Sequence, residues 1–269
     1  MLSNQNIRVR WINPVGIPDY DQSIADLICQ IKQPGTWVDV VSFAMDASPR
    51  HLEYYAYEGL VASNIVRVTR DAAQNNFDGV VIGCFYDLGL REAQNISGEA
   101  VVTAPCLASL QMVSHLANRF SIIVGQQSWV DQMEAKVNEY GYGNSLASMR
   151  AVGLGVLDFQ ADPDRTRRLM IEQAEVAVNK DHAEALILGC TIEYGFYSDL
   201  QKIVGVPVID AVLAAFKTIE HAAVAKKQFG WKPSRLWGCT PPPEDELNEW
   251  GIFEQPAPIG HKIEIEVFP

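Results

Sequence analysis

Two short stretches of the chain share one pattern, and this repeat limits the possible fold more than any other feature of the sequence. Gly79–Ile82 and Ala185–Leu188 are apolar runs of strand length, and each is followed at once by glycine and then cysteine. Such runs are typical of strands buried on both faces of a parallel sheet. The repeat therefore predicts two equivalent strands that end in Cys84 and Cys190.

The repeat extends to both sides of the two cysteines. Strand candidates precede them at Ile7–Asn13 and Phe120–Gly125, and further candidates follow at Ala100–Thr103 and Pro207–Asp210. A small-residue helical run comes after each of the later two. This internal duplication predicts an α/β fold of two lobes, each with a mainly parallel sheet flanked by helices. Because open α/β sheets bind ligands at the carboxyl ends of their strands, we expect both thiols to face one cleft between the lobes.

The duplication also predicts the domain boundaries. We expect a first lobe of residues 1–115 plus 212–269, with 228–269 as a C-terminal extension, and a second lobe of residues 116–211. The extension contains three of the six tryptophans and ends in an alternating run, Lys262–Phe268, that predicts an edge strand. We expect it to pack on the body of the chain or on a second subunit of a homo-oligomer.

Hydrophobic spacing predicts further elements along the chain. It indicates a helix over Tyr54–Asn75, a strand over Val152–Leu157 and a helix over Pro163–Lys180. The apolar face expected for the first of these helices consists of Tyr55, Leu60, Ile65 and Val68. Asp162 and Asp210 each directly precede a helical run, where an aspartate is a favourable N-cap.

Composition excludes several classes of protein. A net charge of −12 over 269 residues argues against non-specific nucleic-acid binding. No apolar run is long enough to predict a membrane span, and Met1–Arg10 lacks the apolar segment of a secretory signal. The five cysteines show no CxxC pair, so neither a zinc site nor a disulfide framework is indicated, and a reducing cytoplasm fits. Nucleotide-binding glycine motifs are also missing from the sequence. We expect no metal and no organic cofactor.

The two cysteines suit one kind of chemistry. A cysteine at a strand end faces a helix N-terminus, whose N–H groups and partial positive charge favour the thiolate. If Cys84 and Cys190 lie on opposite sides of an acidic carbon, one thiolate removes its proton while the other thiol delivers a proton to the opposite face. The stereocentre is then inverted, and backbone N–H groups after each cysteine would hold the enolate oxygen. Cys106 and Cys239 lack the strand–glycine context and are expected to be structural.

An acidic residue follows each cysteine after three positions. Asp87 follows Cys84 and Glu193 follows Cys190. An aspartate at such a place is either a helix N-cap or an orienting hydrogen-bond partner for substrate or thiol, and the two roles are compatible. Gln126 offers a polar side chain at the end of another expected strand.

Four sequence motifs resemble a known family. They are INP at Ile12–Pro14, GCFYDLGL at Gly83–Leu90, LGC at Leu188–Cys190, and GVPVID followed by AAFKTIE at Gly205–Glu220. Together they are similar to the aspartate/glutamate/hydantoin racemase superfamily, most of all to its hydantoin and allantoin racemase branch, over nearly all of residues 7–225. The resemblance implies two pseudo-symmetric Rossmann-like lobes with the active site in the cleft between them. It also implies that Cys84 and Cys190 are the catalytic acid and base.

The expected substrate is a small molecule, either a hydantoin or an amino-acid derivative. The Cys-Thr pair at Cys190 resembles the amino-acid racemase branch, whereas the motif at Cys84 resembles the hydantoin branch, so both classes stay open. We expect substrate contacts from the loops at the strand ends: Asn13, Phe85, Tyr86, Asp87, Gln126, Thr191, Ile192 and Glu193.

Two alternatives remain at the level of sequence. The same superfamily contains maleate isomerase and arylmalonate decarboxylase, which use related cysteines for other reactions. A chain of this kind could also be a non-catalytic, two-lobed protein that binds a small ligand.

Overall fold

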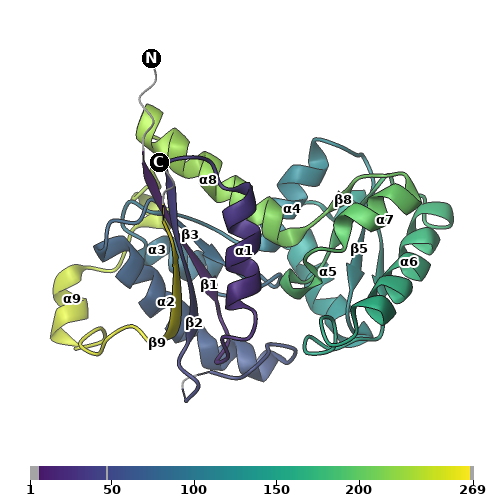
Figure 1. Cartoon of the computed structure of the whole chain (residues 1–269). Coiled ribbons are helices and arrows are strands. Elements are labelled where there is room, and N and C mark those ends of the chain that lie inside the picture. Colours follow the sequence, from purple (N-terminus) through teal and green to yellow (C-terminus); the bar gives the residue numbers. More distant parts are fainter. Residues whose placement is uncertain (1–5, 47, 267–269) are drawn as a thin grey trace. The chain divides into compact units, whose positions relative to one another are not determined.

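The structure is a computed structural model that describes residues 6–46 and 48–266 (Figure 1). The chain forms two compact units. Unit 1 comprises the residues up to Gly83, Leu88–Thr103 and the chain from Phe216 on, and unit 2 comprises Cys84–Asp87 and Ala104–Ala215. Cys84 and residues 104–115 therefore pack with unit 2, whereas the sequence assigned them to the first lobe. The predicted lobes, residues 1–115 plus 212–269 and residues 116–211, stay a prediction.

The sheet of unit 1 has five strands in the order β4-β3-β1-β2-β9. Their bounds are β1 Ile7–Asn13, β2 Thr36–Phe43, β3 Gly79–Ile82, β4 Val101–Thr103 and β9 Ile259–Ile265. The first four strands are parallel, and β9, yellow in Figure 1, pairs antiparallel with β2 at the edge. The predicted edge strand is thus confirmed but begins earlier, at Ile259, and its last two predicted residues lie outside the described part of the chain.

The sheet of unit 2 has four parallel strands in the order β6-β5-β7-β8. Their bounds are β5 Phe120–Val124, β6 Leu146–Ala151, β7 Ala185–Leu188 and β8 Val208–Ile209. Numbered from the start of each repeat, both sheets have the same order, since β4-β3-β1-β2 corresponds to β8-β7-β5-β6. The predicted duplication into two α/β units with parallel sheets is confirmed.

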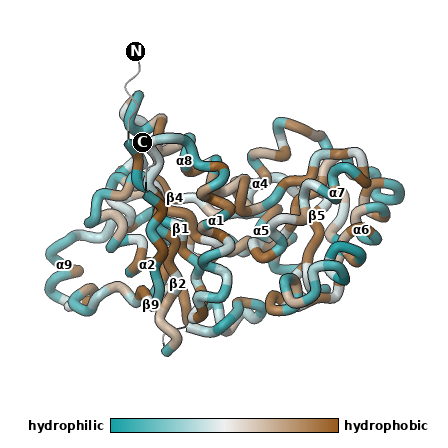
Figure 2. The backbone as a smooth tube through the Cα atoms, viewed as in Figure 1, coloured by the Kyte–Doolittle hydropathy of each residue, from teal (hydrophilic) through white to brown (hydrophobic). Residues whose placement is uncertain are grey.

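Helices flank both sheets. In unit 1 they are α1 Asp21–Ile31, α2 Tyr55–Gln74, α3 Leu90–Ile96 and α9 Glu244–Glu249; in unit 2 they are α4 Pro105–Ser114, α5 Val130–Glu139, α6 Pro163–Asn179 and α7 Tyr197–Val204. Helix α8, Ala211–Phe229, begins in unit 2 and continues into unit 1. In Figure 2 the strand β5 is largely hydrophobic, whereas α6 is largely hydrophilic. None of the helices in the described residues is long and apolar enough to span a bilayer.

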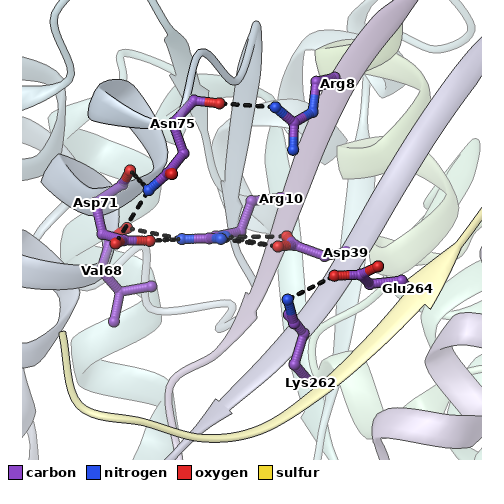
Figure 3. A network of polar contacts seen from close by, with 8 residues as sticks. All are labelled: Arg8, Arg10, Asp39, Val68, Asp71, Asn75, Lys262 and Glu264. Carbon is purple, nitrogen blue, oxygen red and sulfur yellow. Dashed lines mark hydrogen bonds and ion pairs between the residues drawn. The ribbon is translucent and has the colours of Figure 1, made fainter. Parts of the chain in front are cut away.

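A charged side chain is buried inside the apolar core of unit 1 (Figure 3). Arg10 of β1 forms ion pairs with Asp39 of β2 and Asp71 of α2, and its guanidinium stacks 4.4 Å from the ring centroid of Phe77. Removing one partner of such a buried pair would leave an uncompensated charge, at a cost of about 3–5 kcal/mol. The network therefore joins β1, β2 and α2 in a single arrangement.

Two predicted features are wrong in detail. In α2, Ile65 and Val68 are buried, but Tyr55 and Leu60 are exposed, because burial in this helix begins only at Val61. Helical spacing reveals an apolar face, but not how far along the helix a partner covers it.

The strand predicted at Val152–Leu157 is a loop, and the strand of that region is β6, which ends at Ala151. Gly153 has φ +78°, which is incompatible with a strand. Strand β6 lies at a sheet edge and is half-buried throughout, so it carries polar residues such as Ser148 and Arg150. The apolar residues that follow Ala151 resemble a strand in the sequence, which is why the strand was predicted there.

Candidate active site

The two glycines before the cysteines have the same backbone environment. Gly83 N donates to Ile12 O at 2.7 Å, and Gly189 N donates to Ile123 O at 2.8 Å. A Cβ atom on Gly83 would lie 2.9 Å from Ile12 O and 2.6 Å from Trp11 Nε1, and one on Gly189 would lie 2.8 Å from Ile123 O. Real Cβ atoms do not approach this closely, so glycine is required where each strand passes its neighbour.

The cysteines that follow begin the same turn in both halves. Asp87 N donates to Cys84 O at 3.0 Å, and Glu193 N donates to Cys190 O at 3.0 Å. Both cysteines are half-buried. The duplication therefore holds at the level of single hydrogen bonds, and it gives the two thiols equivalent places in the chain.

The carboxylate of Asp87 caps helix α4. It accepts hydrogen bonds from Cys106 N and Leu107 N, both at 2.8 Å, and from the Tyr140 hydroxyl at 2.9 Å. Pro105 at the first helical position has no N–H, so these are the first two N–H groups of the helix. A capping role was one sequence expectation, and the structure assigns it to a helix that begins 18 positions further along the chain.

Burial governs the titration of this cluster. It raises the pKa of Asp87 to about 7, although the N–H groups of Leu107 and Cys106 and the Tyr140 hydroxyl oppose the shift. Burial, and secondly the Asp87 carboxylate, raises the pKa of the Cys106 thiol well above its ordinary value. Cys106 is thus a neutral buried thiol at physiological pH, as a structural cysteine should be.

Glu193 is the counterpart of Asp87, but its carboxyl caps no helix. The N-terminus of α8 is already capped by Asp210, which accepts from two N–H groups of the first turn. Glu193 is fully buried, and within the described part of the chain neither carboxyl oxygen has a hydrogen-bond partner of good geometry. The backbone amides of Cys190 and Gly189 act on the carboxyl and oppose the rise in its pKa that burial causes. Burial raises the pKa of Glu193 well above its ordinary range, and the charge of Asp210 adds to this shift, so the site favours the protonated form of the carboxyl.

Two glutamines lie near the turn at Cys190. Strands β5 and β7 pair in parallel, so Gln126, which follows β5 and is half-exposed, lies at the same sheet edge as Cys190. Gln160 Nε2 donates to Ile192 O at 2.7 Å and so fastens the turn after Cys190. Gln160 could not be predicted from the sequence, because it lies in a loop 30 positions before the cysteine and its contact is with backbone.

Asn13 is the one predicted site residue that belongs to unit 1. It is buried at the carboxyl end of β1, where its Oδ1 accepts from Trp11 Nε1 at 2.7 Å and its Nδ2 donates to Asp21 Oδ1 at 2.5 Å. Both ends of the amide are therefore held by other residues of unit 1.

Burial separates the ten predicted site residues, all of which the structure describes, into two groups. Cys84, Cys190 and Gln126 are partly exposed. The other seven are buried: Asn13, Phe85, Tyr86, Asp87, Thr191, Ile192 and Glu193. Two partly exposed cysteines and a partly exposed glutamine therefore lie in the chain next to site residues that are buried.

Comparison with known proteins identifies the family of this chain. A family model described as Asp/Glu/Hydantoin racemase matches residues 12–219, which include both glycine–cysteine turns. The chain belongs to this family. A hydantoin racemase from Rhizobium meliloti is 35% identical over 173 residues, 64% of this chain and 71% of the relative. One from Paenarthrobacter aurescens is 31% identical over 241 residues, 89% of this chain and 99% of the relative.

Solved structures show the same fold. An allantoin racemase from Klebsiella pneumoniae has a TM-score of 0.82 at 25% identity and covers 89% of this chain and 95% of its own. A maleate isomerase from Pseudomonas putida S16 has a TM-score of 0.62 at 13% identity, covers 81% of this chain and 93% of its own, and supports the fold alone. With its family and its hydantoin racemase relatives established, this Asp/Glu/Hydantoin racemase family member is a racemase enzyme.

Proposed function

We propose that this racemase inverts an acidic carbon centre of a small hydantoin-like substrate, without a cofactor, and that Cys84 and Cys190 act as its paired base and acid. The observation that supports the pair is the repeated turn, in which glycine passes a neighbouring strand and a half-buried cysteine follows in each half. The hydantoin racemase relatives support the substrate class.

The reaction is a proton exchange at one carbon. In one direction the Cys84 thiolate removes the proton and the electron pair of the C–H bond passes into the adjacent carbonyl, which becomes an enolate. The Cys190 thiol then gives its proton to the opposite face of the carbon, and the enolate collapses to the inverted product. The enzyme is left with the two protonation states exchanged, ready for the reverse direction. Each acid or base contributes about 10²–10⁴-fold to the rate.

The residues around the thiols hold the substrate and the turns in this proposal. Gln126 supplies an amide to the polar edge of the ring, while Phe85 and Thr191 each offer a backbone N–H for the enolate oxygen. Asp87 and Glu193 act on the turns rather than on substrate, because both carboxyl groups are buried. We further propose that the enzyme works in a reducing compartment, since thiol chemistry needs reduced cysteines. We also propose that it forms a homo-oligomer.

Deuterium exchange tests the proposal. The purified protein is incubated in heavy water with single enantiomers of 5-substituted hydantoins, allantoin and acidic amino acids, and the reaction is followed by NMR and polarimetry. Deuterium should enter the stereocentre of a hydantoin while optical rotation disappears, and dialysis against a chelator should not change the rate. Exchange confined to amino acids, or activity restored only by an added metal, would contradict the proposed substrate or mechanism.

A further inference from the structure

A fully buried carboxylate joins three elements of unit 1. Asp21, the first residue of α1, accepts hydrogen bonds from Asn13 Nδ2 at 2.5 Å, Ser42 Oγ at 2.8 Å and His261 Nδ1 at 2.8 Å. These donors come from the ends of β1 and β2 and from β9. Because a carboxylate only accepts, Nδ1 of the histidine carries the proton in this contact.

Strand pairing explains why two of these donors meet at one atom. Ser42 of β2 and His261 of β9 are directly opposite in the antiparallel register, and both donate to Oδ2 of Asp21. Opposite residues on one face of an antiparallel pair lie close together. The register of β9 therefore places a histidine against the start of α1, although the two are 240 positions apart in the chain.

From Asp21 the contacts continue toward the Cys84 turn. Asn13 donates to Asp21 through Nδ2 and accepts the indole N–H of Trp11 through Oδ1. The indole nitrogen in turn lies 2.6 Å from the place where a Cβ on Gly83 would stand. Trp11 thus packs directly against Gly83, the residue before Cys84.

The strand that supplies the histidine lies outside the family match. The match ends at residue 219, whereas β9 spans Ile259–Ile265. Strand β9 pairs antiparallel with β2, and the end of β2 carries Ser42. The C-terminal strand therefore adds a side chain to a network that the family region alone would leave with two of its three donors.

We propose that His261 is a positioning residue, which through Asp21 fixes the Asn13 amide and the Trp11 indole and so holds the Gly83 peptide before Cys84, a role that rests on the proposed function of Cys84 as acid and base. The histidine side chain is 44% exposed, whereas that of Asp21 is 1% exposed. The imidazole thus reaches from the sheet edge to a buried acceptor. The extension beyond the family region is part of the catalytic framework of this enzyme.

Kinetics of matched variants test this role. His261→Ala should lower kcat/KM for racemisation by roughly 10- to 100-fold, the range that a displaced catalytic group costs. His261→Asn should restore most of the loss, because an asparagine amide can donate from nearly the same place as Nδ1. Imidazole in solution should also raise kcat/KM of His261→Ala, since the site is partly open. Lys262→Ala, which removes an exposed ion pair with Glu264 on the same strand, is the control and should behave as wild type.

Other outcomes would overturn the role. If His261→Ala lowered the melting temperature but left kcat/KM per folded enzyme unchanged, β9 would be a structural edge strand only. His261→Asn could also be as stable as His261→Ala and still fail to recover activity. In that case loss of the hydrogen bond to Asp21 would not explain the lower kcat/KM of His261→Ala.

A second readout does not depend on activity. In ¹⁵N-labelled protein, His261→Ala should shift the Trp11 indole N–H and the Asn13 side-chain amide signals, while Lys262→Ala should leave both in place. If wild type racemised no hydantoin, the proposed function would fail, yet these signals would still establish the network. If the enzyme were active and the two signals were unchanged in His261→Ala, the positioning role would fail alone.

Discussion

Asp87 and Glu193 occupy equivalent positions in the two halves, three residues after each cysteine, but only the Asp87 carboxylate is hydrogen-bonded to a helix N-terminus. The difference follows from the helices that come later. Helix α4 has alanine at its N-cap position and receives its cap from Asp87, whereas α8 is capped by its own neighbour, Asp210. The duplicated chain has thus left one buried acid satisfied and the other without a partner of good geometry in the described residues.

The first prediction concerns the pH dependence of stability. Burial raises the pKa of Asp87 from 3.8 to about 7, so between about pH 4 and 7 the native state binds a proton that the unfolded state has lost. Stability attributable to this residue should therefore fall as pH rises through that window and then level off. Urea denaturation of wild type and Asp87→Asn should show it, because the variant cannot titrate there. Parallel stability curves for the two proteins from pH 4.5 to 8 would contradict the assignment.

The second prediction concerns Glu193, whose pKa burial raises well above its ordinary value in the folded protein. Above pH ~4.3, where an unfolded glutamate ionises, wild type should lose stability that Glu193→Gln keeps. The amide resembles the protonated acid in shape and charge, so kcat/KM should stay within about threefold of wild type. Denaturation at pH 5 and pH 8, together with initial rates, checks both points. A variant less stable than wild type by more at pH 8 than at pH 5 would show that Glu193 is ionised in the folded protein.

The third prediction concerns the close strand approach at Gly83. A methyl group there would lie 2.9 Å from a backbone oxygen, which cannot move without shifting β1. Gly83→Ala should cost about 1–3 kcal/mol in the free energy of unfolding, as overpacking does, and should lower activity by displacing the cysteine that follows. Gly59→Ala, on α2 with open space around its Cβ position, is the matched control and should be neutral or slightly stabilising. Equal stability of the two variants would contradict the packing account.

Much of the fold followed from the sequence because local patterns and the repeat agreed. The runs before Gly83 and Gly189 predicted equivalent buried strands, and the structure has β3 and β7 there, in sheets of matching order. Asp162 is confirmed as a cap, since it accepts from Arg165 N at 3.0 Å. These features depend on neighbouring residues or on a pattern that occurs twice.

The features that the sequence did not predict depend on residues far apart. Tyr140 meets Asp87 across 53 positions, and His261 meets Asp21 across 240. No short motif encodes such a contact, because it depends on how whole elements pack. The error at Val152–Leu157 came from local sequence instead. Apolar residues there suggested a strand, although two glycines among them disfavour one.

The proposed catalytic roles of the two cysteines are most directly tested by deuterium exchange in Cys84→Ser and Cys190→Ser. A single remaining thiolate can still remove the proton that faces it, but no thiol stands on the other side to complete the inversion. Each variant should therefore lose racemisation by at least ~10²-fold. Each should also exchange the α-hydrogen of one enantiomer without inverting it, and the two variants should prefer opposite enantiomers.

The controls for this measurement are Cys106→Ser and Cys239→Ser, which should stay within a few-fold of wild type. All four variants and wild type are followed by NMR in heavy water with each pure enantiomer of one hydantoin. Exchange of opposite enantiomers by the two active-site variants is the result that the account predicts. Exchange of the same enantiomer by both, or a loss in Cys106→Ser as large as that in Cys84→Ser, would contradict the pairing of Cys84 with Cys190.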